Sequence, residues 1–107
     1  MAYDEVLAQR VLERLEPDGV VAKKMFGSIT CMLNGNTVVS VYEDGLWLRV
    51  GPDGMDDALA EPGVRPAVHR GKQADGWVMV AGDVLDDDIL DHWLAIAMDA
   101  TAELPPK

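Results

Sequence analysis

The sequence predicts an α+β domain, with helices packed on a mostly antiparallel sheet, and three observations lead to that class. Apolar residues recur at helical spacing near the amino end, at a period of two through residues 21–50, and at helical spacing again toward the carboxyl end. Two turn motifs, Asn34-Gly35-Asn36 and Asp44-Gly45, interrupt the period-two region. Such turns join adjacent antiparallel strands. The predicted order is therefore α-β-β-β-α-β-β-α.

The first predicted helix covers residues 3–16. Asp4 and Glu5 suit the positive amino end of a helix, and Pro17-Asp18-Gly19 ends it. Its apolar residues fall on one stripe that would face a core. The stripe comprises Leu7, Ala8, Val11, Leu12 and Leu15.

A three-stranded β-meander is predicted to follow. The first strand begins at about Val21 and continues to Leu33, and both of its alternating sets of residues are fairly apolar. Asn34-Gly35-Asn36 turns the chain into a second strand, Thr37–Glu43. Asp44-Gly45 then turns it into a third strand, Leu46–Val50.

A short helix and two more strands complete the predicted sheet. Asp53 is expected to cap a helix over Gly54–Ala60. A weak strand over Arg65–Arg70 and a firm strand over Trp77–Val80 follow, joined by a turn over Gly71–Gly76.

The closing helix is predicted to begin at Gly82 and Asp83 and to end near Ala102. Its apolar residues cover a wider arc than one stripe requires, and a helix of that kind buries more than one face. One side is expected to meet the sheet, and the other to meet a second protomer in a homodimer. The alternative is that the first helix fills the second side. The arc comprises Leu85, Ile89, Leu90, Trp93, Leu94, Ile96, Ala97 and Met98.

Size and charge place limits on function. A chain of 107 residues fits one domain, predicted over residues 1–104 with a frayed tail at 105–107. The net charge is −10, and residues 81–107 carry seven acids against one base. That balance disfavours direct nucleic acid binding. The absence of long apolar runs and the single cysteine, Cys31, favour a reduced, cytoplasmic protein without a membrane segment.

A series of motifs gives the chain a resemblance to the TfoX N-terminal domain family, which is named for a regulator of competence genes in bacteria. The resemblance implies an α+β domain with an antiparallel sheet, a tendency to dimerise and a regulatory role. The motifs are Lys23-Lys24-Met25-Phe26-Gly27, Met32-Leu33-Asn34-Gly35-Asn36, Leu46-Trp47-Leu48-Arg49-Val50-Gly51-Pro52, Pro62-Gly63-Val64-Arg65-Pro66 and Gly76-Trp77-Val78-Met79-Val80.

A candidate interaction surface lies in the predicted sheet. Alternation places Trp47 and Arg49 on one strand face, where an indole beside a guanidinium could form a groove for a small anion or peptide. The alternative is that the bases pair with acids of the helices as ordinary surface ion pairs. Phe26 would present an apolar edge to a partner or pack a corner between helix and strand. The candidate residues are Lys23, Lys24, Phe26, Trp47, Arg49, Arg65 and Arg70.

No stretch of the sequence has the pattern of a catalytic, metal or cofactor site. The acidic run Asp86-Asp87-Asp88 falls in the first turns of a helix, where the helix dipole favours acids, and it lacks the glycine and glutamate of a calcium loop. Neither His69 nor His92 has a partner at ligand spacing. The expected function is a non-enzymatic regulatory domain that contacts an unidentified protein partner. The alternative is a module that binds a small anion or peptide.

Overall fold

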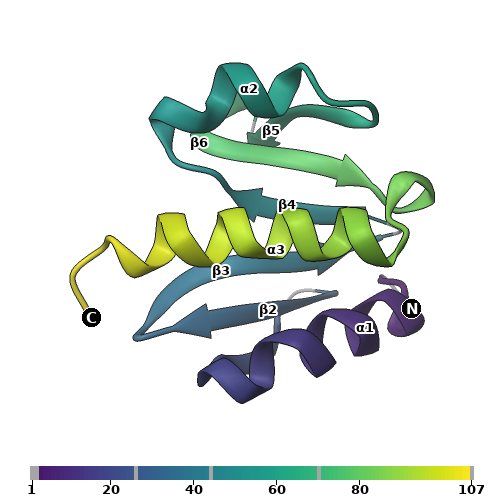
Figure 1. The fold of residues 1–107 in the computed structure, drawn as a ribbon, viewed down its shortest axis with the longest axis vertical. Helices are drawn as coiled ribbons and strands as arrows, with labels where there is room; N and C mark the ends of the chain where they lie inside the picture. Colours follow the sequence, from purple (N-terminus) through teal and green to yellow (C-terminus); the bar gives the residue numbers. More distant parts are fainter. Residues whose placement is uncertain (1–2, 26, 44, 70, 107) are drawn as a thin grey trace.

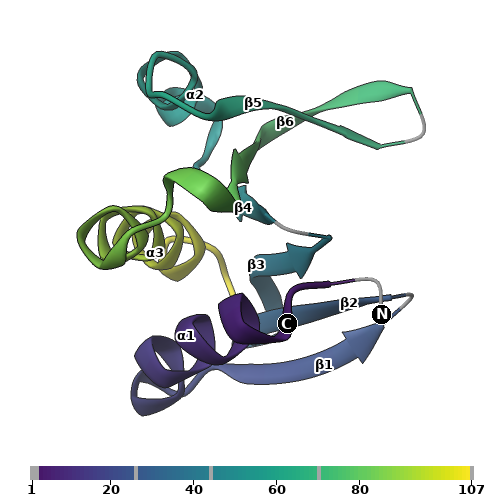
Figure 2. The same ribbon diagram turned by 90° about the vertical axis from the view of Figure 1, so that its right-hand side faces the viewer.

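The computed structural model describes residues 3–25, 27–43, 45–69 and 71–106. It contains an antiparallel six-stranded sheet with α-helices on one of its sides, so the α+β class is confirmed (Figures 1 and 2). The elements, in chain order, are α1 (Glu5–Leu15), β1 (Val21–Met25), β2 (Ser28–Leu33), β3 (Asn36–Tyr42), β4 (Gly45–Arg49), α2 (Met55–Leu59), β5 (Val64–His69), β6 (Lys72–Ala81) and α3 (Asp87–Ala102). Short 3₁₀ turns occupy η1 (Glu16–Asp18), η2 (Pro52–Gly54) and η3 (Gly82–Val84).

The strands lie in the order β1-β2-β3-β4-β6-β5. The first four form a meander, and the chain then passes through α2 to the far edge before β6 returns to pair with β4. Strands β1 and β5 are therefore the two edges of the sheet.

The predicted single strand over residues 21–33 is wrong, because the chain reverses near Gly27. Met25 pairs with Ser28, and Gly27 has a φ of 79°, a conformation in which a side chain would be strained. The segment is therefore two antiparallel strands, β1 and β2, and the observed order is α-β-β-β-β-α-β-β-α.

The predicted turn over Gly71–Gly76 is also wrong, since most of it belongs to β6. His69 pairs with Lys72, which makes β5 and β6 a long hairpin with a short connection. Figure 2 shows this hairpin extending away from the helix layer. Because the far end of β6 has little to pack against, its residues are polar and a pattern search based on apolar alternation does not find them.

The helices begin at positions that their caps define. Asp4 Oδ1 accepts a hydrogen bond from Leu7 N at 3.1 Å at the start of α1. Asp86 Oδ1 accepts one from Ile89 N at 2.9 Å, so α3 begins at Asp87 rather than at Gly82 or Asp83. No side-chain hydrogen bond caps α2, and the expected capping role of Asp53 is not fulfilled.

One core fills the space between the sheet and helices α1 and α3. The α1 stripe is buried except for Leu12, which is partly buried, and α3 lies across β3 and β4 with Trp93 only 1% exposed (Figure 1). The sheet contributes one face of alternate residues to this core. Its members include Ile29, Cys31, Val39, Val41, Leu46, Leu48, Val78 and Val80. In the described part of the chain no helix has the length and hydropathy needed to span a membrane.

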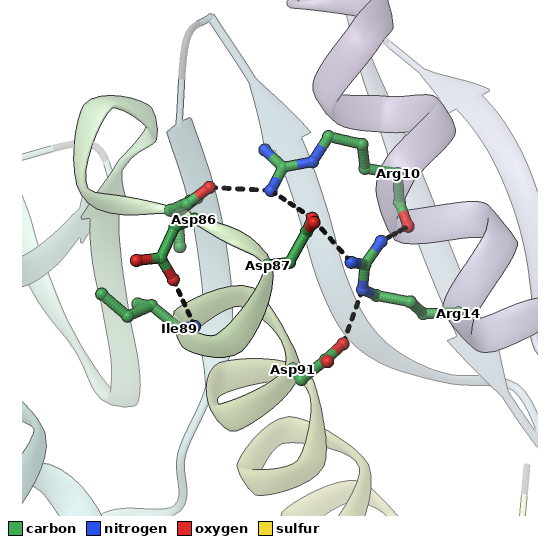
Figure 3. Close-up of polar contacts among 7 residues, drawn as sticks. Arg10, Arg14, Asp86, Asp87, Ile89 and Asp91 are labelled. Atoms are coloured by element: carbon green, nitrogen blue, oxygen red, sulfur yellow. Dashed lines mark hydrogen bonds and ion pairs between the residues drawn. The ribbon is translucent and has the colours of Figure 1, made fainter.

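Helix α1 packs beside α3, which agrees with the alternative that the first helix covers the second side of the closing helix. Figure 3 shows the polar part of this contact. Arg10 and Arg14 both reach Asp87, at 3.1 and 2.9 Å, and Arg14 Nε donates to Asp91 at 2.6 Å. The hydrogen bond from Arg10, with the charge of Arg14, lowers the pKa of Asp87.

Candidate functional site

The helices α1 and α3 cover only one face of the sheet, and the opposite face is called here the open face (Figure 2). Side chains of directly paired residues in an antiparallel sheet share a face. The central row of the open face crosses all six strands. It runs through Lys23, Thr30, Ser40, Trp47, Met79 and Arg65.

Two tryptophans and an arginine form the centre of the open face. Arg49 pairs with Trp77 across β4 and β6, one step along the sheet from the Trp47–Met79 pair. The two indole rings lie 5.9 Å apart at an angle of 47°, and Arg49 Cζ lies 4.5 Å from the centre of the Trp77 ring. This distance is typical of a cation–π contact. Trp47, Arg49 and Trp77 are called the Trp–Arg cluster below.

The position of the Arg49 guanidinium is fixed from two sides. The Trp77 ring lies on one side of the guanidinium, and Arg49 Nε donates to Thr37 O at 2.9 Å. The carbonyl of Thr37 is near a register shift, where two residues of β3 oppose Met32 of β2. Arg49 is half-buried, and that burial lowers the pKa of its guanidinium.

Within the described ranges, Arg49 has no carboxylate at ion-pair distance, whereas Arg10 and Arg14 have two between them. The chain has 19 acids, so the difference does not reflect a shortage of carboxylates. Lys23, Lys24, Arg65 and Lys72 likewise lack ion pairs with any residue that the structure describes. The expectation that these bases pair with the helix acids is therefore not met in this part of the chain.

A depression of about 380 Å³ lies beside the Trp–Arg cluster, between β3, β4, β6 and the start of β5. Gly45 contributes no side chain to it, and Arg65 lines it with Glu43. Tyr42 is the large aromatic residue of this depression and is 42% exposed. The depression thus continues the central row toward the β5 edge.

A second, larger groove of about 640 Å³ lies at the end of β4, next to the last turns of α3. Arg49 is one of the residues that line this groove, so the groove adjoins the Trp–Arg cluster. Among the described residues, no group of three or more His, Cys, Asp and Glu is close enough to hold a metal ion. The groove is called here the acidic groove, and its carboxylates belong to Asp53, Asp75, Asp99 and Glu103.

Comparison with known proteins places this fold in a family. Residues 11–101 match the model of the TfoX N-terminal domain, which is more than half of the chain. The chain belongs to the TfoX N-terminal domain family. No curated protein and no solved structure matches it. The segments around Trp47 and Arg49 and around Trp77, both within the matched residues, form the neighbouring strands β4 and β6 of this TfoX N-terminal domain.

The TfoX N-terminal domain brings together only some of the candidate residues. Trp47 and Arg49 are neighbours, whereas Lys23 and Arg65 lie on the same face at opposite edges of the sheet. Lys24 pairs with Ile29, whose side chain is in the core, so Lys24 belongs to the helix side. Phe26 and Arg70 lie outside the described residues.

Sequence reasoning missed Trp77 as a member of the site. Alternation within its strand separates Trp77 and Met79 from the core residues Val78 and Val80, and this pattern could have assigned it to the open face. Its contact with Arg49 depends on the pairing of β4 with β6, which no local pattern predicts.

The cysteine Cys31 and the histidine His92 lie in surroundings that suit a structural role. Cys31 is fully buried, and burial, with a smaller effect from Glu16, raises its pKa to about 11, so its thiol stays neutral at physiological pH. His92 Nε2 lies 3.0 Å from the Glu61 carboxylate and connects α3 to the turn after α2. Both side chains are well exposed, and neither lines one of the two hollows described above.

Proposed function

We propose that this TfoX N-terminal domain is a small, non-enzymatic regulatory domain of the cytoplasm that acts by binding another protein with its open face. One observation carries the proposal, the presence of the Trp–Arg cluster on a sheet face that no helix covers. Tryptophan, tyrosine, methionine and arginine are enriched in the cores of protein interfaces and contribute most of their binding energy.

The distribution of bases supports protein contacts rather than nucleic acid binding. Lys23, Arg49 and Arg65 lie on separate strands of the open face, and Lys24 lies on the other face. A phosphate backbone requires clustered bases, because each turn of duplex presents many closely spaced charges. Dispersed bases around an aromatic centre suit a protein surface better.

Photocrosslinking from two positions tests the proposal. A photoreactive amino acid at Met79, on the open face, is expected to crosslink to one protein partner in cells, because Met79 adjoins the Trp–Arg cluster. The same amino acid at Ala95, an exposed position of α3, is the control and should not crosslink to it. The purified partner should bind the wild-type domain about tenfold more tightly than a Trp77→Ala variant, as expected for an interface anchor. Crosslinks from Ala95 alone would contradict the assignment to the open face.

A homodimer forms a separate part of the proposal. Two apolar residues of the helix layer support it, since Val6 and Ile89 are 72% and 36% exposed. Light scattering at micromolar concentration should give twice the mass of the chain. A strict monomer would remove the homodimer and leave the interaction role of the open face standing.

A second candidate function is a module that binds a small anion or peptide at the Trp–Arg cluster. The fixed Arg49 guanidinium without a carboxylate favours it. Saturable binding of inorganic phosphate or free glutamate, abolished by Arg49→Gln, would support this candidate in place of a protein partner.

A further inference from the structure

The rows of paired residues on the open face carry bases, whereas the chain as a whole is acidic. The rows of paired residues on this face include Lys23, Arg49 and Arg65. The paired positions of those rows include no acid among the described residues, although the chain as a whole carries a net charge of −10. Acids lie at the border of the face, with Glu43 beside Arg65 in the depression and Asp75 beside Arg49 in the acidic groove. A surface and its partner tend to have complementary potentials.

The open face is therefore a poor surface for a second copy of itself. Two such faces packed together would bring Arg49 and its neighbours against like charges, which costs binding energy. An acidic protein segment would instead place a carboxylate opposite each base. Thr30 and Ser40, which separate Lys23 from the centre of the row, are only 4% and 7% exposed, so the accessible stretch runs from Trp47 through Met79 to Arg65. Neighbouring strands are about 4.8 Å apart, so this stretch spans roughly 10 Å, the length of about three extended residues.

Arg49 is prepared to receive one of those carboxylates. Its Nε donates to Thr37 O, and its Cζ lies 4.5 Å from the centre of the Trp77 ring, so these two contacts hold the guanidinium before any partner arrives. Thr37 O is its only acceptor among the described residues. A planar guanidinium held in this way leaves its two terminal amino groups for a bidentate carboxylate. The carboxylates of the acidic groove do not fulfil this role, since none lies within ion-pair distance.

We propose that the open face binds an acidic segment of a partner protein, with one carboxylate on Arg49 and adjoining apolar side chains on Trp47 and Met79. This inference rests on the proposed function and names the chemistry of its partner. Half-buried aromatic and methionine side chains next to a desolvated arginine form the usual centre of such an interface.

Two synthetic peptides of twelve residues test the inference on the wild-type domain. One alternates glutamate with leucine, and in the other every glutamate is replaced by glutamine. We expect the glutamate peptide to bind about tenfold or more tightly than the glutamine peptide by fluorescence anisotropy. In NMR spectra it should shift the Arg49 Nε–H and the Trp77 indole signals. The Trp93 indole, which is buried under α3, is an internal reference and should not shift.

Two variants that each lose one positive charge distinguish binding at Arg49 from a general attraction between the peptide and a basic residue. Arg49→Gln is expected to weaken binding of the glutamate peptide about tenfold or more. Arg49→Lys should weaken it by a smaller factor, because lysine keeps the positive charge but cannot donate two parallel hydrogen bonds to one carboxylate. Lys24→Gln removes the same charge from the other side of the sheet and should change affinity by less than about twofold. If Arg49→Gln destabilises the domain, the inference is still tested by the two peptides, because they are compared on the wild-type domain.

Each of the other outcomes would overturn the inference. Equal binding of both peptides would leave an apolar interface and the proposed function intact, without a preference for acids. Tighter binding of a single-stranded oligothymidylate would point to nucleic acid. Free glutamate that competes as well as the peptide would point to a small-anion site. Absence of any shift with either peptide would also refute it, while the crosslink from Met79 tests the proposed function separately.

Discussion

At the scale of single residues, Arg49 differs from the arginines of α1 in what stabilises its charge. Arg14 is stabilised by carboxylates, and its hydrogen bond to Asp91 is the main reason that its pKa rises. Arg49 has an aromatic ring and a carbonyl instead, and burial lowers its pKa. Arginine stays protonated at physiological pH in both settings. The open face therefore keeps a permanent cation that its own chain does not neutralise within the described residues.

Gly45 is the residue that allows β4 and β6 to approach closely. A Cβ atom built at Gly45 would lie 2.6 Å from Val80 O, closer than real contacts of this kind. This contact involves backbone, so a larger residue cannot be accommodated by rotating a side chain. Gly45 also lines the depression beside the Trp–Arg cluster, where it contributes no side chain.

Replacing Gly45 with alanine is expected to destabilise the domain by about 1–3 kcal/mol, because β4 and β6 must move apart where β4 begins. Chemical denaturation measures this change. Gly54→Ala is the matched control, since its Cβ would meet only Val50 Cβ at 3.6 Å, an ordinary contact. Equal stability of the Gly45→Ala variant and the wild type would show that the strands adjust without cost.

At the scale of elements, the two edge strands have residues that discourage pairing with other chains. Strand β1 carries Lys23 and Lys24, and charged lysines on an edge oppose the addition of another strand. Strand β5 contains Pro66, which lacks an N–H, next to a register shift. These features disfavour the addition of a strand from another chain at either edge.

Helices α1 and α3 are joined by charge as well as by apolar packing. Asp87 accepts from both Arg10 and Arg14, and its pKa is lower than usual. A carboxylate with a depressed pKa in the folded state stabilises that state above the pKa of the unfolded chain, and the contribution is lost as the pH falls through the folded value.

An Asp87→Asn variant should therefore be less stable than the wild type at pH 7, and the difference should shrink as the pH falls below about 4. Denaturation with urea at several pH values measures it. Asp88→Asn removes an acid from the same helical turn without an arginine partner in the described structure. A loss of stability as large in Asp88→Asn as in Asp87→Asn would assign the effect to the helix dipole instead of the ion pairs.

At the scale of the whole molecule, the sequence predicts the class and most of the elements because their signals are local. Asn34-Gly35 joins the paired strands β2 and β3 as predicted. Strands β3 and β4 are paired as predicted too, with Tyr42 opposite Gly45, although Asp44 lies outside the described residues. The turn near Gly27 lacks an asparagine or aspartate and is hidden in continuous apolar alternation. The outer part of β6 is polar, and only its pairing with β5 makes it a strand.

In the candidate site, too, local patterns predict some features, and others depend on how the strands pair. Alternation along one strand is enough to place Trp47 and Arg49 on one face, and the structure places them there. Trp77 joins them only because β6 returns to the middle of the sheet, which is a property of the complete topology. The uncovered state of that face also depends on where all the helices pack, so periodicity within one element cannot predict it.

The return of β6 to the interior of the sheet has a consequence for synthesis on the ribosome. Strand β5 leaves the ribosome before β6, yet β6 is its only neighbour in the sheet. Until β6 emerges, β4 also lacks one of its two neighbours, so both β4 and β5 have backbone groups that await pairing with β6. Completion of both depends on a single late segment, so the final third of translation determines when the outer strand acquires a stable position.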